Sequence, residues 1–314
     1  MSSETIGGLA EALQRLKGDN STSKYKTDVE FVYTSSQNWP LPPGVNLPDP
    51  YNPPIRIAIL DSSFNPPTKA HLALAMAPLP DSTGKRTYDA RMLLLSVTNA
   101  DKKLKPGDAT YVQRLEMMYI LADEASRRSA TDPAKPDAPF CVAAIDEPTF
   151  VGKSRKLREF IDNRLGGLQR AGDLPLARVE LYFILGFDTV TRLFDPRFYG
   201  NSTEEMDAAL RRFFAPGPEG DNSHVVCARR TMNQDVDVKA EEEAFFSQPE
   251  VAPYRDSGSI LMLQLDPFLQ TLSSTRARSS VRASYEEPAL GSGDKLSDLV
   301  PVRIARYIQE NKLY

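Results

Sequence analysis

The sequence contains few cysteines and histidines, and this scarcity excludes several kinds of site. Of 314 residues, two are cysteine and two are histidine. Cys141 and Cys227 both lie in apolar runs, which is typical of buried thiols. Two cysteines cannot build a disulfide framework, and Cys and His do not recur at metal-ligand spacing. The sequence therefore predicts neither a disulfide-rich protein nor a protein metal centre.

Strong net charge and long apolar segments are also lacking. The net charge is −4 at pH 7, which provides no broad basic surface for nucleic acid. The first residues, MSSETIGG, lack the basic and apolar regions of a signal peptide. No apolar run approaches the length that spans a bilayer. We therefore expect a cytoplasmic or nuclear protein that binds neither nucleic acid nor membrane.

The sequence changes character after residue 54. Residues 1–54 combine an amphipathic stretch ending at Gly18, a candidate strand at 28–34 and a proline-rich segment. The proline-rich segment contains Trp39, the only tryptophan, which we expect to pack against the rest of the protein. We interpret residues 1–54 as an N-terminal extension and linker, and residues 55–314 as the main domain.

Short apolar runs alternate with helix-period stretches in the main domain. The runs are near-continuously apolar, as in strands buried on both faces. Strand–helix alternation predicts an α/β fold, a Rossmann-like doubly wound parallel sheet with helices on both faces. In such sheets, ligands bind at the carboxyl ends of the strands. The runs span residues 55–60, 92–98, 140–145, 179–185, 223–228 and 260–265.

The first of these strands leads into DSSFNPPTKAHL, residues 61–72. The amides of the turn and of the following helix start favour an anion. Thr68 and His71 are three residues apart and share one face of the first helical turn. His71 could donate a hydrogen bond to a phosphate oxygen, and Asn65 could fix the loop. The alternative is an ordinary turn with a capping threonine and a histidine bonded within the protein.

A second unit, residues 263–282, also passes from a strand to a helix start. Ser274, Arg278 and Arg282 are spaced by four and share a helix face, whereas Arg276 lies on another side. An arginine suits this position because its planar fork contacts phosphate oxygens in pairs. The alternative is a capped surface helix with solvated arginines.

Three further segments carry polar groups after strands. Gly186 and Asp188 suit contact with a ribose or an amide, although Asp188 could instead cap a helix. Lys102 and Lys103 could meet phosphate or only solvent. Arg229 could contact a ligand or serve the structure. The acidic run at residues 241–243 is typical of a solvated face.

Taken in order, these motifs resemble the nicotinamide mononucleotide adenylyltransferases within the nucleotidylyltransferase superfamily. Residues 62–71 resemble the family's G-x-F-N-P-x-(H/T)-x-x-H, and residues 273–278 match S-S-T-x-x-R. Residues 186–188 match G-x-D, and residues 307–314 match Y-I-x-x-x-x-L-Y. The resemblance covers about residues 55–314, which would form a nucleotidylyltransferase domain of a divergent eukaryotic, fungal type.

The resemblance implies substrates and site residues. The partners would be ATP and a pyridine mononucleotide, with Mg²⁺ accompanying ATP. The residues implied to be catalytic are His71, Thr68 and Arg278. Those implied to bind ATP are Ser62, Ser63, Phe64, Asn65, Lys102, Lys103, Ser274 and Thr275. Those implied to bind the mononucleotide are Gly186, Phe187 and Asp188.

The implied reaction transfers AMP from ATP to nicotinamide mononucleotide, or to nicotinic acid mononucleotide, and releases pyrophosphate. Relatives that use phosphopantetheine or form cytidylyl products share the phosphate motifs, so the acceptor stays open. A non-catalytic nucleotide-binding protein and a homo-oligomeric assembly also stay open. Two residues depart from the family: Ser62 stands where the family has glycine, and no tryptophan follows the strand at 140–145. Phe150 or Phe187 would take the place of that tryptophan.

Overall fold

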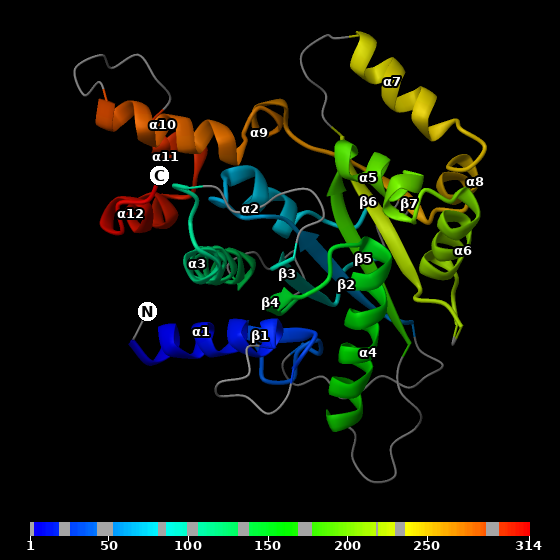
Figure 1. Cartoon of the computed structure of the whole chain (residues 1–314), viewed down its shortest axis with the longest axis horizontal. Coiled ribbons are helices and arrows are strands. Elements are labelled where there is room, and N and C mark those ends of the chain that lie inside the picture. Colours follow the sequence, from blue (N-terminus) through cyan, green and yellow to red (C-terminus); the bar gives the residue numbers. More distant parts are fainter. Residues whose placement is uncertain are drawn as a thin grey trace.

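The protein is built on one seven-stranded sheet, seen here in a computed structural model (Figure 1). The structure describes residues 3–18, 26–42, 53–80, 86–98, 106–130, 138–168, 178–217, 219–229, 236–286 and 295–314. The strands are β1 (Val29–Thr34), β2 (Ile55–Asp61), β3 (Ala90–Ser96), β4 (Phe140–Ile145), β5 (Val179–Gly186), β6 (Ser223–Arg229) and β7 (Ile260–Gln264). All six apolar runs of the main domain are therefore strands, as the sequence predicted.

The strand order is β1-β4-β3-β2-β5-β6-β7. Strands β2 to β7 pair in parallel, and β1 pairs antiparallel with β4 at one edge. The chain winds outward from β2 through β3 to β4, and from β5 through β6 to β7. The switch point lies between β2 and β5, and in this doubly wound arrangement their carboxyl ends form the expected binding crevice.

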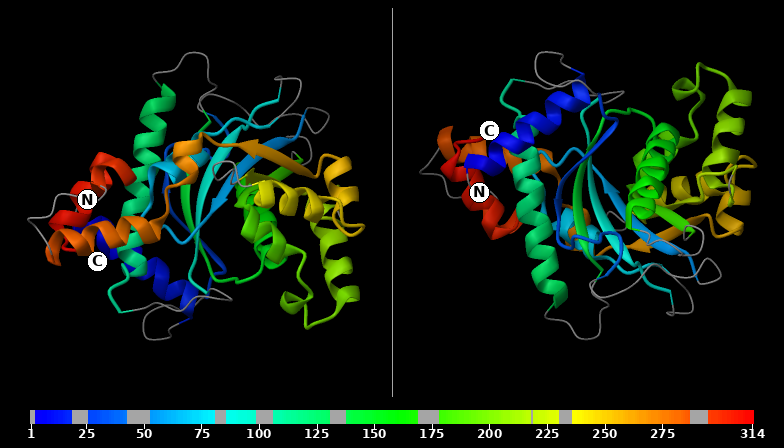
Figure 2. Two further views of the ribbon diagram at one scale, coloured as in Figure 1. Left: turned by 90° about the horizontal axis from the view of Figure 1, so that it is seen from above. Right: turned by 90° about the horizontal axis from the view of Figure 1, so that it is seen from below.

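Two helical layers cover the sheet, as Figure 2 shows. The helices on one face are α1 (Ser3–Lys17), α2 (Lys69–Met76), α3 (Tyr111–Ala130), α10 (Ser274–Glu286), α11 (Leu296–Leu299) and α12 (Val302–Glu310). Those whose residues pack on the other are α4 (Phe150–Leu168), α5 (Phe187–Leu193), α6 (Thr203–Phe214) and α7 (Val236–Phe246). The short helices α8 (Ala252–Asp256), η1 (Pro196–Phe198) and α9 (Pro267–Gln270) lie in connections.

Alternate strand residues face the two layers. In β2, Ala58 and Leu60 pack into one core, and Ile57 and Ile59 pack into the other. Because both faces are buried, the strand reads as a continuous apolar run rather than an alternating one. The predicted α/β fold, a doubly wound parallel sheet with helices on both faces, is confirmed.

The described part of the N-terminal extension packs tightly on the sheet. The predicted strand at 28–34 is β1, and Arg15 of α1 binds Glu30 of β1 through two hydrogen bonds of 2.9 and 2.8 Å. Trp39 is fully buried, and its indole N–H donates to the carbonyls of Arg91 and Pro139. The predicted packing of Trp39 is confirmed, while the boundary at residue 54 stays a prediction. Among the described residues, no helix has both the length and the apolar character required to cross a bilayer.

Candidate active site

The first motif lies at the switch point. Strand β2 ends at Asp61, the loop follows, and α2 begins at Lys69. The Ser62 N–H donates to the Leu94 carbonyl at 3.3 Å, which ties the loop start to β3. Phe64 has a φ of 45°, and its ring is fully buried beside that of His71, with 5.3 Å between the ring centroids. The Phe64 side chain thus belongs to the core, and only its backbone can face a ligand.

His71 is held at both ring nitrogens. The Thr68 backbone N–H donates to its Nδ1 at 3.0 Å, and the Thr68 hydroxyl lies 2.9 Å from the same atom. Because a backbone N–H only donates, Nδ1 is an acceptor and the neutral ring carries its proton on Nε2. Nε2 lies 2.9 Å from the Ser62 hydroxyl oxygen, so it donates there. Burial lowers the pKa of His71 to about 4, which keeps the ring neutral at pH 7.

Thr68 is the N-cap of α2. Its hydroxyl accepts from the His71 N–H, and the His71 ring accepts from the Thr68 N–H, which completes a capping box. The Thr68 side chain is fully buried. Thr68 therefore fixes the orientation of the imidazole at Nδ1 and leaves Nε2 directed toward Ser62. The capping role that the sequence left open is present, and it coexists with an imidazole N–H that points toward Ser62.

The second motif meets the first. Helix α10 begins at Ser274, and the Ser274 hydroxyl donates to the Pro66 carbonyl at 2.8 Å. Arg278 donates from Nη1 to the Asn65 carbonyl at 2.6 Å and from Nη2 to the Thr275 hydroxyl at 3.3 Å. In Figure 1 the starting end of α10 lies next to α2, and the rest of α10 leads away from it. The start of α10 is thus bonded to the Asn65 and Pro66 carbonyls of the loop that leads into α2, about 200 residues earlier in the sequence.

A polar network braces this loop. The Asn65 side chain donates to Asp108 at 2.8 Å and accepts from the Ala109 N–H at 3.3 Å and the Tyr314 hydroxyl at 2.9 Å. Arg114 lies 3.8 Å from Asp108 and donates to the Ser63 carbonyl at 3.4 Å. The sequence predicted that Asn65 fixes the loop, and this bonding does so.

Three members of the network escaped the sequence reasoning. Asp108 and Arg114 follow Lys102 and Lys103, and only those lysines were given a candidate role from the sequence. Tyr314 belonged to the terminal motif but had no assigned role. Tyr314 lies in the terminal motif, which could have pointed to it, but nothing in the sequence indicates that Asp108 or Arg114 contacts the loop.

A buried ion pair stands on the other side of β2. The Lys153 ammonium of α4 lies 2.5 Å from an Asp61 carboxylate oxygen, and both side chains are less than a tenth exposed. The same ammonium lies 4.7 Å from the centre of the Phe150 ring. Lys153 therefore brings a cation next to the residue that precedes Ser62. The sequence reasoning missed this pair because 92 residues separate its members.

The third motif lies at the carboxyl end of β5, where α5 begins. Gly186 is the N-cap of α5, with a φ of −75°. A Cβ added there would meet no atom within 4 Å, so neither backbone conformation nor packing requires glycine. Asp188 is exposed in the first helical turn and is not the cap, so the capping alternative is wrong.

The two candidate replacements for the family tryptophan are both engaged in packing. The Phe187 ring is buried against Phe245 and Phe246 of α7, at centroid distances of 5.5 and 5.9 Å. Phe150 is half-buried, with its ring next to the Lys153 ammonium. A stacking face on Phe187 would require α7 to move, whereas Phe150 is partly accessible as it stands.

The remaining sequence expectations concern two lysines, Arg229 and the acidic run at residues 241–243. Lys102 and Lys103 lie outside the described residues. Arg229 is bound by Glu242 at 2.8 Å and Glu243 at 3.0 Å, which supports its structural interpretation. Glu242 is only 3% exposed, so the acidic run is not simply a solvated face. The expectation failed because Arg229 offsets the cost of burying that carboxylate.

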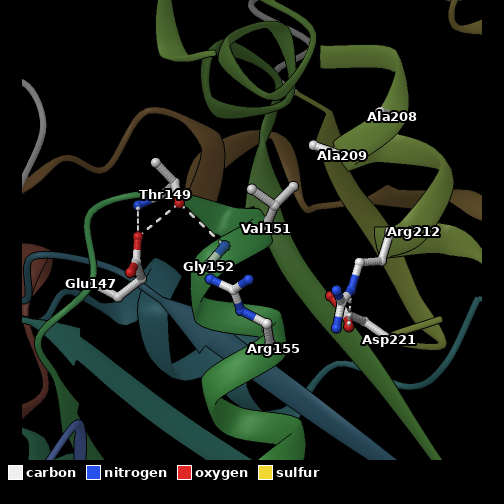
Figure 3. Close-up of a pocket in the computed structure, with 9 residues that line it drawn as sticks. All are labelled: Glu147, Thr149, Val151, Gly152, Arg155, Ala208, Ala209, Arg212 and Asp221. Atoms are coloured by element: carbon white, nitrogen blue, oxygen red, sulfur yellow. Dashed lines mark hydrogen bonds and ion pairs between the residues drawn. The ribbon is translucent and has the colours of Figure 1, made fainter. Parts of the chain in front are cut away.

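A cavity of about 360 Å³ lies between α4 and α6 (Figure 3). Its lining includes no residue that the sequence assigned to the site. Glu147 accepts from the Thr149 N–H and hydroxyl, which satisfies the start of α4. In the described part of the chain, no group of three or more His, Cys, Asp or Glu side chains could hold a metal ion. The cavity is lined by Glu147, Thr149, Val151, Gly152, Arg155, Ala208, Ala209, Arg212 and Asp221.

Comparison with known proteins adds to this geometry. No protein-family model matches the sequence. A Schizosaccharomyces pombe (strain 972 / ATCC 24843) protein named "Putative nicotinamide mononucleotide adenylyltransferase" is 29% identical over 235 residues, which cover 74% of this chain and 78% of the relative. This similarity confirms the resemblance drawn from the motifs.

Two solved structures are similar over most of the chain. Both are nicotinic acid mononucleotide adenylyltransferase from Plasmodium falciparum, one complexed with NaAD and one with APC. The first has a TM-score of 0.49 and 14% sequence identity, and covers 82% of this chain and 97% of its own. The second has a TM-score of 0.46 and 14% identity, with 82% and 96% covered.

Proposed function

We propose that this chain is an adenylyltransferase that transfers AMP from ATP to nicotinamide mononucleotide or nicotinic acid mononucleotide. The observation that carries this proposal is the convergence of the starts of α2 and α10 on one loop at the switch point. His71 brings a neutral N–H donor to that place, and Arg278 brings a fixed positive charge. The relative from S. pombe supports the same chemistry.

The reaction needs positioning and charge stabilisation rather than a protein nucleophile. A 5′-phosphate oxygen of the mononucleotide attacks the α-phosphorus of ATP in line, and a new P–O bond forms. The bond from the α-phosphorus to the α,β-bridging oxygen breaks, and pyrophosphate leaves. Negative charge grows on the phosphoryl oxygens, where the guanidinium of Arg278 and the amides at two helix starts stabilise it.

His71 acts as a hydrogen-bond donor, not as an acid that gives up its proton. Its Nδ1 is occupied by Thr68, and its pKa of about 4 keeps the ring neutral throughout the physiological range. A neutral donor fits this reaction because no atom of the substrates must be protonated for pyrophosphate to leave. We assign His71, Thr68 and Arg278 to the phosphate machinery on this basis.

Mg²⁺ would enter with ATP. The two carboxylates next to the loop at residues 62–68 already have partners in the protein. Asp61 pairs with Lys153, and Asp108 pairs with Asn65 and Arg114. The triphosphate oxygens are therefore the ligands that we propose for the ion. When bound, Mg²⁺ supplies charge neutralisation on the leaving pyrophosphate.

Product analysis tests the function. The purified protein is incubated with Mg²⁺, one nucleotide donor, ATP or CTP, and one acceptor at a time: nicotinamide mononucleotide, nicotinic acid mononucleotide or phosphopantetheine. We expect a dinucleotide and pyrophosphate with a pyridine mononucleotide. Product with phosphopantetheine alone, or with CTP alone, would assign another transferase. ATP binding without turnover of any acceptor would leave the non-catalytic alternative.

A further inference from the structure

Ser62 stands directly in front of the imidazole of His71. Its hydroxyl oxygen lies 2.9 Å from Nε2, and its backbone N–H is tied to Leu94 at the end of β3. A glycine, which the family motif has at this place, could not make the side-chain contact. The first motif of this chain therefore contains a hydroxyl at a position where the family motif has none.

The direction of the Ser62–His71 hydrogen bond is fixed by Thr68. Because the Thr68 backbone N–H occupies Nδ1, the proton of the neutral ring is on Nε2, and Ser62 is the acceptor. A hydroxyl that accepts still has its own proton to donate. Within the described residues, His71 is the one hydrogen-bond partner of the Ser62 hydroxyl, and Ser62 is only half-buried. Its O–H is thus available to a ligand.

We propose that Ser62 relays the hydrogen bond of His71 to a phosphate oxygen of ATP. The chain runs from Nε2–H to the Ser62 oxygen and from the Ser62 O–H to the phosphate. No covalent bond is made or broken in the protein, and no proton is transferred between His71, Ser62 and the phosphate. Two hydrogen bonds in series polarise each other, so His71 strengthens the donor that touches the substrate. Ser62 is then the catalytic contact, and His71 is its positioning residue.

This inference rests on the proposed function, and it has a rival. In the rival, Ser62 only fills the space left by a glycine and screens His71 from the phosphate. The two differ in sign. If Ser62 relays the hydrogen bond, removing its hydroxyl lowers kcat. If Ser62 only fills space (the plug), removing its side chain raises kcat.

A set of variants separates them through kcat with ATP and the mononucleotide. We expect Ser62→Ala to lower kcat about 10²-fold, the cost of one lost donor to a developing oxyanion, with a smaller change in KM. Ser62→Gly should retain more activity than Ser62→Ala, because the phosphate can then approach Nε2 directly. Ser257→Ala, an exposed serine after α8, is the matched control and should stay at the wild-type rate.

Coupling to His71 is the sharper readout. If His71 acts through Ser62, adding His71→Ala to Ser62→Ala should cost far less than His71→Ala alone. Independent, additive losses would overturn the relay. Wild-type or higher kcat in both Ser62→Ala and Ser62→Gly would establish the plug instead.

Ring ¹⁵N NMR tests the relay without turnover. The chain has two histidines, so His71 and His224 are readily distinguished by substitution. A non-hydrolysable ATP analogue should shift the Nε2 signal of His71 in the wild type and in Ser257→Ala, and much less in Ser62→Ala. An equal shift in Ser62→Ala would contradict the relay. If the wild type forms no dinucleotide, the proposed function fails, while this shift still decides the role of Ser62.

Discussion

The two segments that we propose to bind the phosphates and the base are built differently. We use "phosphate side" for residues 62–71 with Arg278, and "base side" for Gly186, Phe187 and Asp188 with α7. The phosphate side is fixed by hydrogen bonds from distant parts of the chain, including Ser274 and Tyr314. The base side has open space at Gly186 and aromatic packing behind it. The first arrangement is held by hydrogen bonds, whereas the second is held by aromatic packing, with no atom within 4 Å of a Cβ added at Gly186.

The largest effect should come from the imidazole. We expect His71→Ala to lower kcat about 10²–10³-fold, because the variant loses the Nε2 donor and leaves the Ser62 hydroxyl without its partner. The side chain also caps α2, so the variant's thermal unfolding must be measured beside its steady-state kinetics. A folded variant that turns over like the wild type would remove His71 from the mechanism.

Arg278 should come next. Arg278→Ala removes the charge and the bond to the Asn65 carbonyl, and we expect kcat/KM for ATP to fall about 10²-fold. Arg278→Lys should recover only part of this, because an ammonium lacks the planar fork. Arg276, which bonds to Thr271 instead, provides the matched control. Equal losses in Arg276→Ala and Arg278→Ala would show a general charge effect rather than a specific clamp.

The base side should respond in KM rather than kcat. Gly186→Ala fits the backbone and meets no protein atom within 4 Å, so only the small cost of alanine at the N-cap of α5 should lower its unfolding temperature. If a ligand approaches Gly186, the added methyl group should raise a substrate KM about 10-fold with kcat nearly kept, the mark of lost uniform binding. Unchanged kinetics would place both substrates away from this residue.

Tyr314 should have a smaller influence on the phosphate side. Tyr314→Phe removes a hydroxyl that donates to Asn65 at 2.9 Å, and one such bond contributes about 1 kcal/mol. We expect kcat to fall several-fold and KM to change little, since the loop loses a brace but no ligand contact. The measurement is steady-state kinetics at saturating ATP. A variant that affects KM alone would argue that the Tyr314 hydroxyl touches substrate.

The smallest effect should be that of pH near neutrality. The pKa of His71 is about 4 in the folded protein and its ordinary value is 6.5, so kcat should show no inflection from this group between pH 6 and 8. Between 6.5 and 4 the unfolded state binds more protons, so the His71 contribution lowers stability as pH falls through that window. The pH dependence of stability is measured for the wild type and for His71→Ala, and the contribution of His224, present in both, cancels in the difference. An inflection in kcat near pH 6.5 that depends on His71 would contradict a neutral donor.

The sequence predicted the fold well because burial leaves a local signature. Both faces of β2 are covered, which forces the uninterrupted apolar run at residues 55–60. The motif residues were also found locally, since His71 and Thr68 are neighbours on one helical turn. Their meeting with Arg278 followed from the rule that ligands bind where strands end.

What the sequence could not provide were contacts over long separations. Tyr314 and Asn65 are 249 residues apart, and Lys153 and Asp61 are 92 apart. No periodicity connects such pairs. The burial of Glu242 was unpredictable for a related reason, because it depends on Arg229 from another element. Local patterns thus find the candidate residues for the chemistry, and tertiary structure is needed to find the residues that hold them in place.

The most direct test is a crystal structure of the protein with a non-hydrolysable ATP analogue. The account predicts that the triphosphate lies at the starts of α2 and α10, within hydrogen-bonding distance of both Ser62 and Arg278. A triphosphate bound elsewhere, for example in the cavity between α4 and α6, would contradict it.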